Sequence, residues 1–179
     1  MLDIQIFQFI NNLTGRNILI DNFFIFITIF GNLLLFLIIL FTKNKKLILK
    51  SILGYILVRV VDLGINLIYY RPRPFITQEV NLLISQKSTA SFPSGHAMLA
   101  FSFAQLFYFY NKKYGVVAYL LAFLVAFSRI YVGVHYPLDT FVGIALGIGI
   151  AFTVKYLFEK YSLMKKLEKG WKSIYSKFK

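Results

Sequence analysis

The 179-residue sequence contains no cysteine, and it has seven acidic side chains against twenty lysines and arginines. Without cysteine there can be no disulfide framework, no cysteine-ligated metal and no thiol nucleophile. The formal net charge of +13 raises the question of nucleic-acid binding. However, the lysines fall in loops and in the C-terminal tail beside apolar runs, which is typical of membrane topology signals. We therefore expect no nucleic-acid partner.

Charged residues are scarce because most of the chain is apolar. Hydrophobic residues make up 58% of the sequence and the mean hydropathy is +0.67, which is more than one soluble core of this size needs. A helix needs ~20 apolar residues to cross a bilayer. Periodicity and helix breakers predict five crossings, of which the third is short: residues 23–41, 47–70, 97–110, 114–134 and 138–158.

The N-terminal segment is too short to cross the membrane. Residues 4–13 show a loose helical period with asparagines interleaved, which predicts a helix along the membrane surface. Asp3 and the lack of a small-residue cleavage site argue against a cleavable export signal. The predicted fold is all-α: a polytopic membrane helical bundle of five to six helices with one N-terminal interfacial helix. We expect a single domain over residues 1–179, with an interfacial segment 1–22, a transmembrane core 23–158 and a basic cytoplasmic tail 159–179.

The positions of the lysines predict the orientation of the bundle. Loops rich in lysine and arginine stay in the cytoplasm, and lysines follow the first, third and fifth predicted crossings. They are Lys43, Lys45, Lys46 and Lys50, then Lys112 and Lys113, then Lys155, Lys160 and those beyond. The tail, which includes Trp171, is expected to rest on the inner leaflet as an amphipathic helix. The opposite, outer face carries all four prolines and both histidines, a concentration that indicates a functional site.

Three segments with residues suited to phosphate chemistry fall on the outer face. They are Arg71-Pro72-Arg73-Pro74, Pro93-Ser94-Gly95-His96, and Ser128-Arg129 followed by His135 and Asp139. Arg73 and Arg129 carry planar guanidinium groups that can bind phosphate oxygens in pairs. Ser94 and Gly95 stand at the expected N-terminus of the third crossing, where N–H groups and the helix dipole favour an anion.

The same residues could in principle form a metal centre or an anion site. Two histidines and one carboxylate could ligate iron, but the arginines beside them would oppose a divalent cation. We therefore predict an anion site with no metal and no cofactor.

The second and third segments match in full two signatures of the type 2 phosphatidic acid phosphatase family, whose active sites resemble those of vanadium haloperoxidases. The resemblance covers residues 47–158 and implies a membrane phosphatase that acts on a lipid phosphate without metal. It also implies that His135 is the nucleophile, through a phosphohistidine intermediate, and that His96 is the general acid. Asp139 would orient His135.

The chain departs from the first signature of that family, which is a lysine, six residues and then Arg-Pro. Counting back from Arg73 places Asn66 at the lysine position. We expect Arg71 to supply the missing charge to the phosphate. Arg59 is the alternative, but it lies ~10 Å deeper along the helix. Because Arg59 and Asp62 are three residues apart on one helical face, we interpret them as a structural ion pair that holds helices together.

The resemblance leaves several lipid substrates open. The chain is a compact form of five to six helices and contains Arg-Pro-Arg-Pro-Phe, a short loop and Ser-Phe-Pro-Ser. In these features it is most similar to bacterial undecaprenyl diphosphate phosphatases, followed by lipid A 1-phosphatases and phosphatidylglycerophosphate phosphatases. The expected location is the bacterial cytoplasmic (inner) membrane, with the active site facing the periplasm or cell exterior. The expected partners are the bilayer and a lipid substrate, with no obligate protein partner. The alternative from another class is a non-hydrolytic protein that binds or transports anionic lipids.

Overall fold

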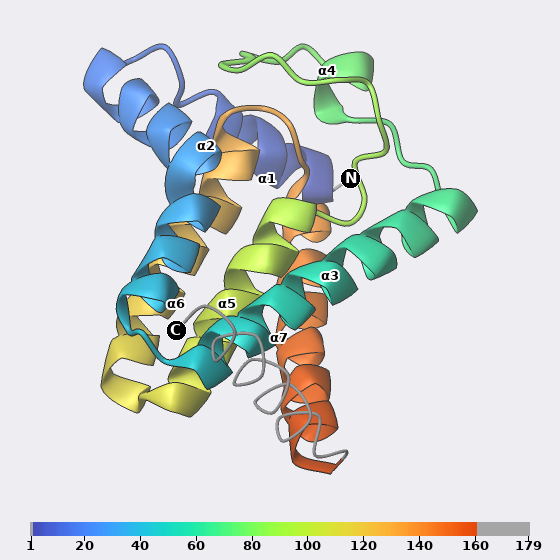
Figure 1. The fold of residues 1–179 in the computed structure, drawn as a ribbon. Coiled ribbons are helices and arrows are strands. Elements are labelled where there is room, and N and C mark those ends of the chain that lie inside the picture. Colours follow the sequence, from blue (N-terminus) through green and yellow to red (C-terminus); the bar gives the residue numbers. More distant parts are fainter. Residues whose placement is uncertain (1, 161–179) are drawn as a thin grey trace, which may run out of the picture.

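The computed structural model describes residues 2–160, and all regular elements of this part of the chain are helices (Figure 1). In order they are α1 (Leu2–Asn11), α2 (Ile18–Phe41), α3 (Lys45–Ile68), α4 (Pro74–Thr77), α5 (Gly95–Tyr110), α6 (Lys112–Tyr131) and α7 (Pro137–Lys160). The predicted all-α bundle is confirmed. The tail expected to lie on the inner leaflet, with Trp171, falls outside the described residues.

Four of the described helices, α2, α3, α6 and α7, are long and apolar enough to cross a membrane. They correspond to the predicted crossings at 23–41, 47–70, 114–134 and 138–158, with shifted ends. The largest shift is at the start of α2, which begins at Ile18 because the side chain of Asn17 accepts hydrogen bonds from the amides of Leu19 and Ile20. This N-cap satisfies two amides that the first turn of the helix leaves without partners.

The third predicted crossing is α5, which has 16 residues and is therefore ~24 Å long. It packs against α2, α3, α6 and α7 at the centre of the bundle (Figure 1). The contact with α7 is close because a Cβ on Gly147 would lie 2.2 Å from the backbone oxygen of Met98. Since neighbouring helices cover α5, its length does not have to match the ~30 Å hydrocarbon layer.

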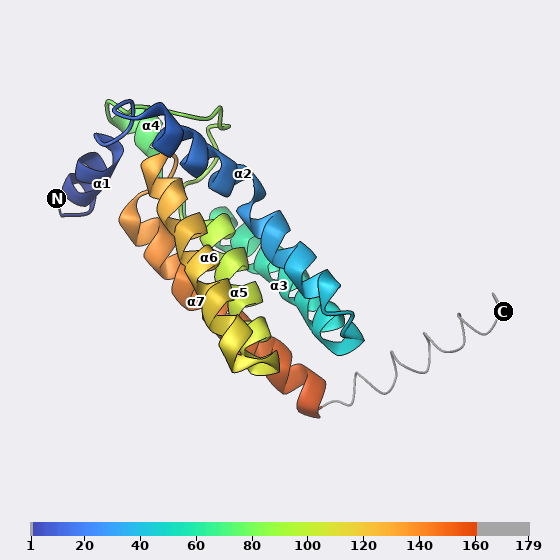
Figure 2. The same ribbon diagram turned by 90° about the vertical axis from the view of Figure 1, so that its left-hand side faces the viewer.

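The two ends of the bundle differ in what they carry. The lysine-bearing connections α2–α3 and α5–α6 lie at the same end as the C-terminus of α7, whereas α1, α4 and the loop before α5 lie at the other end (Figures 1 and 2). At that second end α1 packs against α6 and α7, and Phe7 is fully buried beside Ile130 and Tyr136. The predicted N-terminal helix is thus present, and it is docked on the protein through Phe7.

Candidate active site

His135 lies in the short connection between α6 and α7, where the backbone makes a tight turn. Gly133 has a φ of +87°, and a Cβ there would lie 2.5 Å from the side chain of Val80, so the turn requires glycine. The amides of Val134 and His135 both donate to the carbonyl of Arg129, at 3.2 Å. This turn holds the imidazole inside the protein, where 3% of His135 is exposed.

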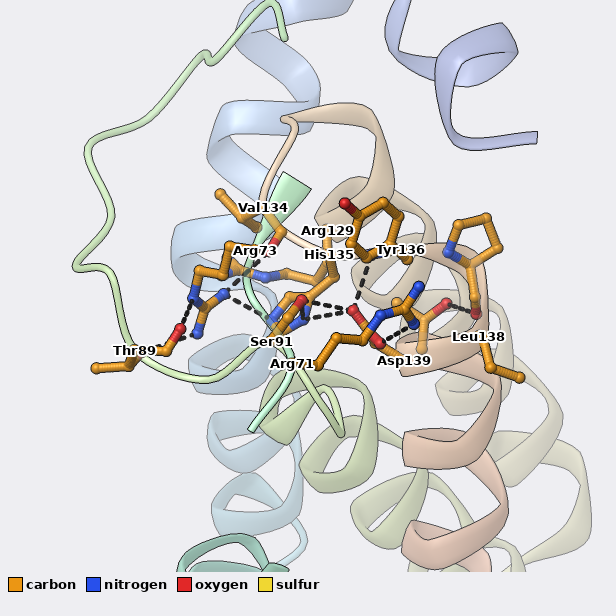
Figure 3. Close-up of polar contacts among 12 residues, drawn as sticks. Arg71, Arg73, Thr89, Ser91, Arg129, Val134, His135, Tyr136, Leu138 and Asp139 are labelled. Carbon is orange, nitrogen blue, oxygen red and sulfur yellow. Dashed lines mark hydrogen bonds and ion pairs between the residues drawn. The ribbon is translucent and has the colours of Figure 1, made fainter. Parts of the chain in front are cut away.

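Each ring nitrogen of His135 faces a different group (Figure 3). Nη1 of Arg73 lies 3.2 Å from Nε2, and Oδ2 of Asp139 lies 3.7 Å from Nδ1. A guanidinium group can only donate, so Nε2 must accept, and in the neutral ring the proton is on Nδ1. The lone pair of Nε2 therefore points towards the arginine. This is the tautomer that a histidine nucleophile requires.

Burial keeps this imidazole neutral. Removal from water lowers the pKa of His135 to about 4, and the positive charges of Arg129 and Arg73 act in the same direction. The hydrogen bond to Asp139 and its negative charge oppose that shift without cancelling it. At neutral pH His135 thus has a lone pair available on Nε2.

Ser91 is a site residue that the sequence analysis missed. Its hydroxyl donates to Oδ2 of Asp139 at 2.5 Å and lies 3.5 Å from Nδ1 of His135. The amide of Tyr136 donates to the same carboxylate oxygen at 2.9 Å. Ser91 stands in Ser-Phe-Pro-Ser, just before the second signature, and that proximity was the available signal. The hydroxyl fixes the carboxylate that faces Nδ1 of His135.

Arg73 and Arg129 form a buried cationic pair of side chains beside His135. Arg73 donates through Nε to the carbonyl of Thr89 at 3.1 Å and through Nη1 to the carbonyl of Val134 at 3.0 Å. Nη1 of Arg129 donates to Oγ1 of Thr28 at 2.7 Å. Within residues 2–160 neither arginine forms an ion pair with a carboxylate, and Nε of Arg129 has no hydrogen-bond partner. Their positive charge is available to an anion.

Burial also affects the protonation of Arg73. Desolvation lowers the pKa of its guanidinium group below the ordinary value. Asp139, Asp62 and Tyr70 oppose this shift without cancelling it. An anion bound beside Arg73 would favour the charged form further, since opposite charges stabilise each other in a site with little water.

A cavity of about 690 Å³ connects these groups. It is lined by His135, Arg73 and Arg129 together with His96 and Gly95 from the start of α5. Residues of α2 and α3 form another part of its wall: Asn32, Tyr55, Val58, Arg59, Asp62, Leu63 and Asn66. The structure therefore brings the two histidines and the two predicted phosphate-binding arginines to one space.

His96 and Gly95 lie in the first turn of α5, as predicted. Nδ2 of Asn32 on α2 donates to the carbonyl of His96 at 3.3 Å. A Cβ on Gly95 would lie 3.4 Å from Oδ2 of Asp62, so Gly95 faces α3. The side chain of Ser94 is not among the cavity-lining groups. Ser94 is fully buried and its amide donates to the carbonyl of Asp139 at 3.0 Å, which ties α5 to α7.

Arg71 does not lie where the sequence analysis expected it. Its Nη1 donates to Oδ1 of Asp139 at 2.6 Å and its Nη2 to Oδ2 of Asp3 at 2.5 Å, and it does not line the cavity. The guanidinium also stacks 4.1 Å from the ring of Tyr136. Two carboxylates thus hold Arg71 behind His135, on the side away from Nε2, because guanidinium binds carboxylate as readily as phosphate.

Protonation of Arg71 follows from this position. Burial alone would lower the pKa of the guanidinium, but the hydrogen bonds and negative charges of Asp3 and Asp139 outweigh burial and raise it. Arg71 is accordingly a fixed cation that stabilises the ionised form of Asp139.

Asn66, at the position where the family has lysine, lines the cavity without contributing charge. Its Nδ2 donates to Oδ1 of Asp62 at 3.2 Å, and Nη1 of Arg59 donates to Oδ2 of the same carboxylate at 3.2 Å. The Arg59–Asp62 ion pair predicted from the sequence is therefore present. It lies within α3 and faces the cavity, so the interpretation that it joins two helices is wrong.

The chain is similar to known proteins both in sequence and in fold. Residues 45–162 match the PAP2 superfamily. The chain is 34% identical over 157 residues to undecaprenyl-diphosphatase BcrC of Bacillus subtilis, covering 84% of this chain and 81% of that protein. It is 33% identical over 82 residues to a lipid A 1-phosphatase of Rhizobium johnstonii, covering 45% and 34% respectively. The crystal structure of Aquifex aeolicus LpxE superimposes with a TM-score of 0.76 and 36% identity, over 86% of this chain and 94% of that one.

Proposed function

Because the chain belongs to the PAP2 superfamily and is a multi-pass membrane phosphatase of lipid phosphates, we propose that it hydrolyses undecaprenyl diphosphate to undecaprenyl phosphate and inorganic phosphate. The observation that carries the proposal is the neutral His135 imidazole, whose Nε2 faces a cavity containing two arginines that form no ion pair among residues 2–160. Transfer of a phosphoryl group through a covalent intermediate requires this combination of a nucleophile and fixed cations.

In the first step Nε2 of His135 attacks the terminal phosphorus. The bond from phosphorus to the bridging oxygen breaks as the bond from phosphorus to nitrogen forms, and the lipid phosphate leaves. Arg73 and Arg129 stabilise the charge that gathers on the equatorial oxygens. Arg73 already lies 3.2 Å from Nε2, so its N–H can turn from the imidazole to a phosphate oxygen as the substrate binds.

Proton transfers complete the reaction. His96 lines the same cavity and donates a proton to the departing oxygen. It then takes a proton from a water molecule, whose oxygen attacks the phosphohistidine, so that inorganic phosphate leaves and both imidazoles return to their starting states. Ser91 fixes the carboxylate of Asp139, which faces Nδ1–H of His135 and stabilises this proton as it becomes more acidic while the ring carries the phosphoryl group.

Two features support a lipid diphosphate as the substrate. The similarity to the Bacillus undecaprenyl-diphosphatase extends over most of both chains. The cavity includes Leu63, a residue of α3 that is also exposed on the outside of the bundle, which suits a substrate that approaches from the lipid. A lipid A 1-phosphatase is the second candidate, supported by the shorter match to the Rhizobium enzyme.

The orientation of the site is also a proposal. The lysine-bearing connections lie at the end of the bundle opposite the α6–α7 connection (Figures 1 and 2), which contains His135. Since lysine-rich loops remain in the cytoplasm, we infer that the cavity opens at the outer face of a bacterial cytoplasmic membrane.

The test is release of phosphate by the purified protein in EDTA. We expect undecaprenyl diphosphate to be turned over faster than lipid A carrying a 1-phosphate, and His135→Ala to abolish release. Faster turnover of lipid A would replace the first candidate by the second. Lipid binding without phosphate release from either substrate would support the non-hydrolytic alternative, and normal release by His135→Ala would exclude the proposed nucleophile.

A further inference from the structure

Arg59 and Asp62 lie in the cavity but belong to none of the three signature segments. Nη1 of Arg59 donates to Oδ2 of Asp62 at 3.2 Å, and their side chains are 51% and 14% exposed. An exposed ion pair one helical turn apart contributes little to stability. Charged residues inside a membrane-spanning helix nonetheless carry a high free-energy cost, and they usually have a functional role.

The cavity extends along α3 away from His135. Asp62 lies level with Gly95, because a Cβ on Gly95 would be 3.4 Å from its carboxylate. Arg59 and Tyr55 follow in successive turns of α3 towards the opposite end of the bundle and line the same cavity. Arg59 is therefore ~4.5 Å further along the helix axis than Asp62. The order along the cavity is the nucleophile and its arginines, then the start of α5, then Arg59.

Asp62 and Asn66 hold Arg59 in a defined place. Asn66 donates to one oxygen of the Asp62 carboxylate and Arg59 to the other. Within residues 2–160 Arg59 has no other hydrogen bond, so Nε and Nη2 have no partner there. A guanidinium group has donors on all three nitrogens in a rigid plane, which leaves several donors for a ligand while one remains on Asp62.

We propose that Arg59 binds the second phosphate group of a lipid diphosphate, the group that stays with the lipid after hydrolysis. The proposal rests on the proposed function. When the terminal phosphate lies among His135, Arg73 and Arg129, the second phosphate is one bridging oxygen away, in the part of the cavity that leads along α3. Negative charge develops on this phosphate as the bond breaks, so a cation there stabilises the leaving group.

This assignment makes Arg59 the residue that distinguishes a diphosphate from a monophosphate. A lipid monophosphate places its single phosphate at His135 and has no charged group near α3. The site therefore has two cationic parts: Arg73 and Arg129 for the transferred group, and Arg59 for the leaving group. The third cation is supplied from inside α3 and not from the family lysine position at Asn66.

Arg59→Gln tests the proposal with two substrates that share one tail, farnesyl diphosphate and farnesyl monophosphate. We expect kcat/KM to fall about 10- to 100-fold for the diphosphate, the loss associated with charged hydrogen bonds, and to change less than about twofold for the monophosphate. Arg16→Gln is the matched control, because it removes the same charge from an exposed position outside the cavity. Equal losses on both substrates would overturn the proposal.

A second variant separates binding from simple charge balance. The double variant Arg59→Gln, Asp62→Asn removes both charges. If Arg59 only neutralised Asp62, this double variant would turn over the diphosphate at the wild-type rate, and that result would overturn the proposal. We expect the double variant to remain selectively impaired on the diphosphate. Wild-type turnover decides the proposed function separately: a wild-type protein that hydrolyses lipid monophosphates and no diphosphate would refute that function, whatever the Arg59 variants show.

Discussion

Arg71 donates to Asp139 at 2.6 Å, and this bond is one link in a chain of contacts between the N-terminal helix and the proposed nucleophile. Arg71 also donates to Asp3 of α1 at 2.5 Å, and Asp3 in turn accepts the amide of Leu138 at 2.8 Å. The carboxylate of Asp139 faces His135 on its other side. A side chain from the start of the chain therefore helps to fix the carboxylate that holds the imidazole.

Arg71→Gln should lower kcat with little change in KM. Arg71 acts through Asp139 and does not line the cavity, so its removal disturbs the orientation of His135 and leaves substrate binding intact. We expect a loss of about 10-fold, smaller than the roughly 100-fold or more expected of a group that stabilises the transition state directly. Steady-state kinetics on a lipid diphosphate measure this, with Arg71→Lys recovering part of the rate. A large rise in KM would instead place Arg71 on the substrate.

Ser91→Ala should reduce kcat by about 10-fold, because the hydroxyl is one of the groups that fix Asp139. Without this hydroxyl the carboxylate is fixed less firmly, and its contact with Nδ1 of His135 is already long at 3.7 Å. Ser102→Ala is the matched control, since Ser102 is equally buried and its hydroxyl has no hydrogen-bond partner within residues 2–160. Equal activity of the two variants would show that Ser91 has no positioning role.

The arrangement of the helices was largely predictable from the sequence. Long apolar runs mark α2, α3, α6 and α7. Because Lys112 and Lys113 should lie on the same side of the membrane as the other lysine-rich loops, the sequence also predicts that the short helix α5 connects the two ends of the bundle. The docking of α1 was not predictable. Phe7 fits an apolar stripe that could face lipid or protein, and the buried contact with Tyr136 depends on residues more than a hundred positions away.

The site was predictable where the signatures supplied it, and less so elsewhere. His96, His135, Arg73 and Arg129 meet in one cavity, as expected. The direction of Arg71 could not be read from the sequence, because a guanidinium pairs equally well with phosphate or carboxylate. Its partners Asp3 and Asp139 are each 68 positions away. Ser91 is likewise separated from Asp139 by 48 positions, beyond the range of any local pattern.

Gly147→Ala should destabilise the bundle by about 1–3 kcal/mol through overpacking. The added Cβ would lie 2.2 Å from the backbone oxygen of Met98, which cannot move without displacing α5. Gly149→Ala is the control on the same helix, because a Cβ there meets nothing within 4 Å. Thermal unfolding in detergent should show a lower Tm for the first variant and an unchanged or higher Tm for the second. Equal midpoints would contradict the close packing of α5 on α7.

His135 should titrate far below an ordinary histidine. The sequence has two histidines, so His96→Gln with an affinity tag free of histidine leaves one imidazole to follow by NMR. We expect its resonances to move around pH 4, because burial and the charges of Arg129 and Arg73 lower the pKa of His135 to about 4. The neutral form thus persists at all higher pH values and is lost as the pH falls through about 4. A midpoint near the ordinary value of ~6.5 would show that the ring is not desolvated.

His96→Ala should allow the phosphohistidine to accumulate. A lipid phosphate is a stable leaving group, so phosphoryl transfer to His135 depends less on a proton donor than the attack of water depends on a base. We expect rapid mixing with a substrate labelled in its terminal phosphate, followed by an alkaline quench, to show labelled protein in this variant and much less in the wild type. His135→Ala is the control that should carry no label. Label that persists in His135→Ala would identify another nucleophile. If His96→Ala turned over slowly but carried as little label as the wild type, His96 would act mainly in the first step.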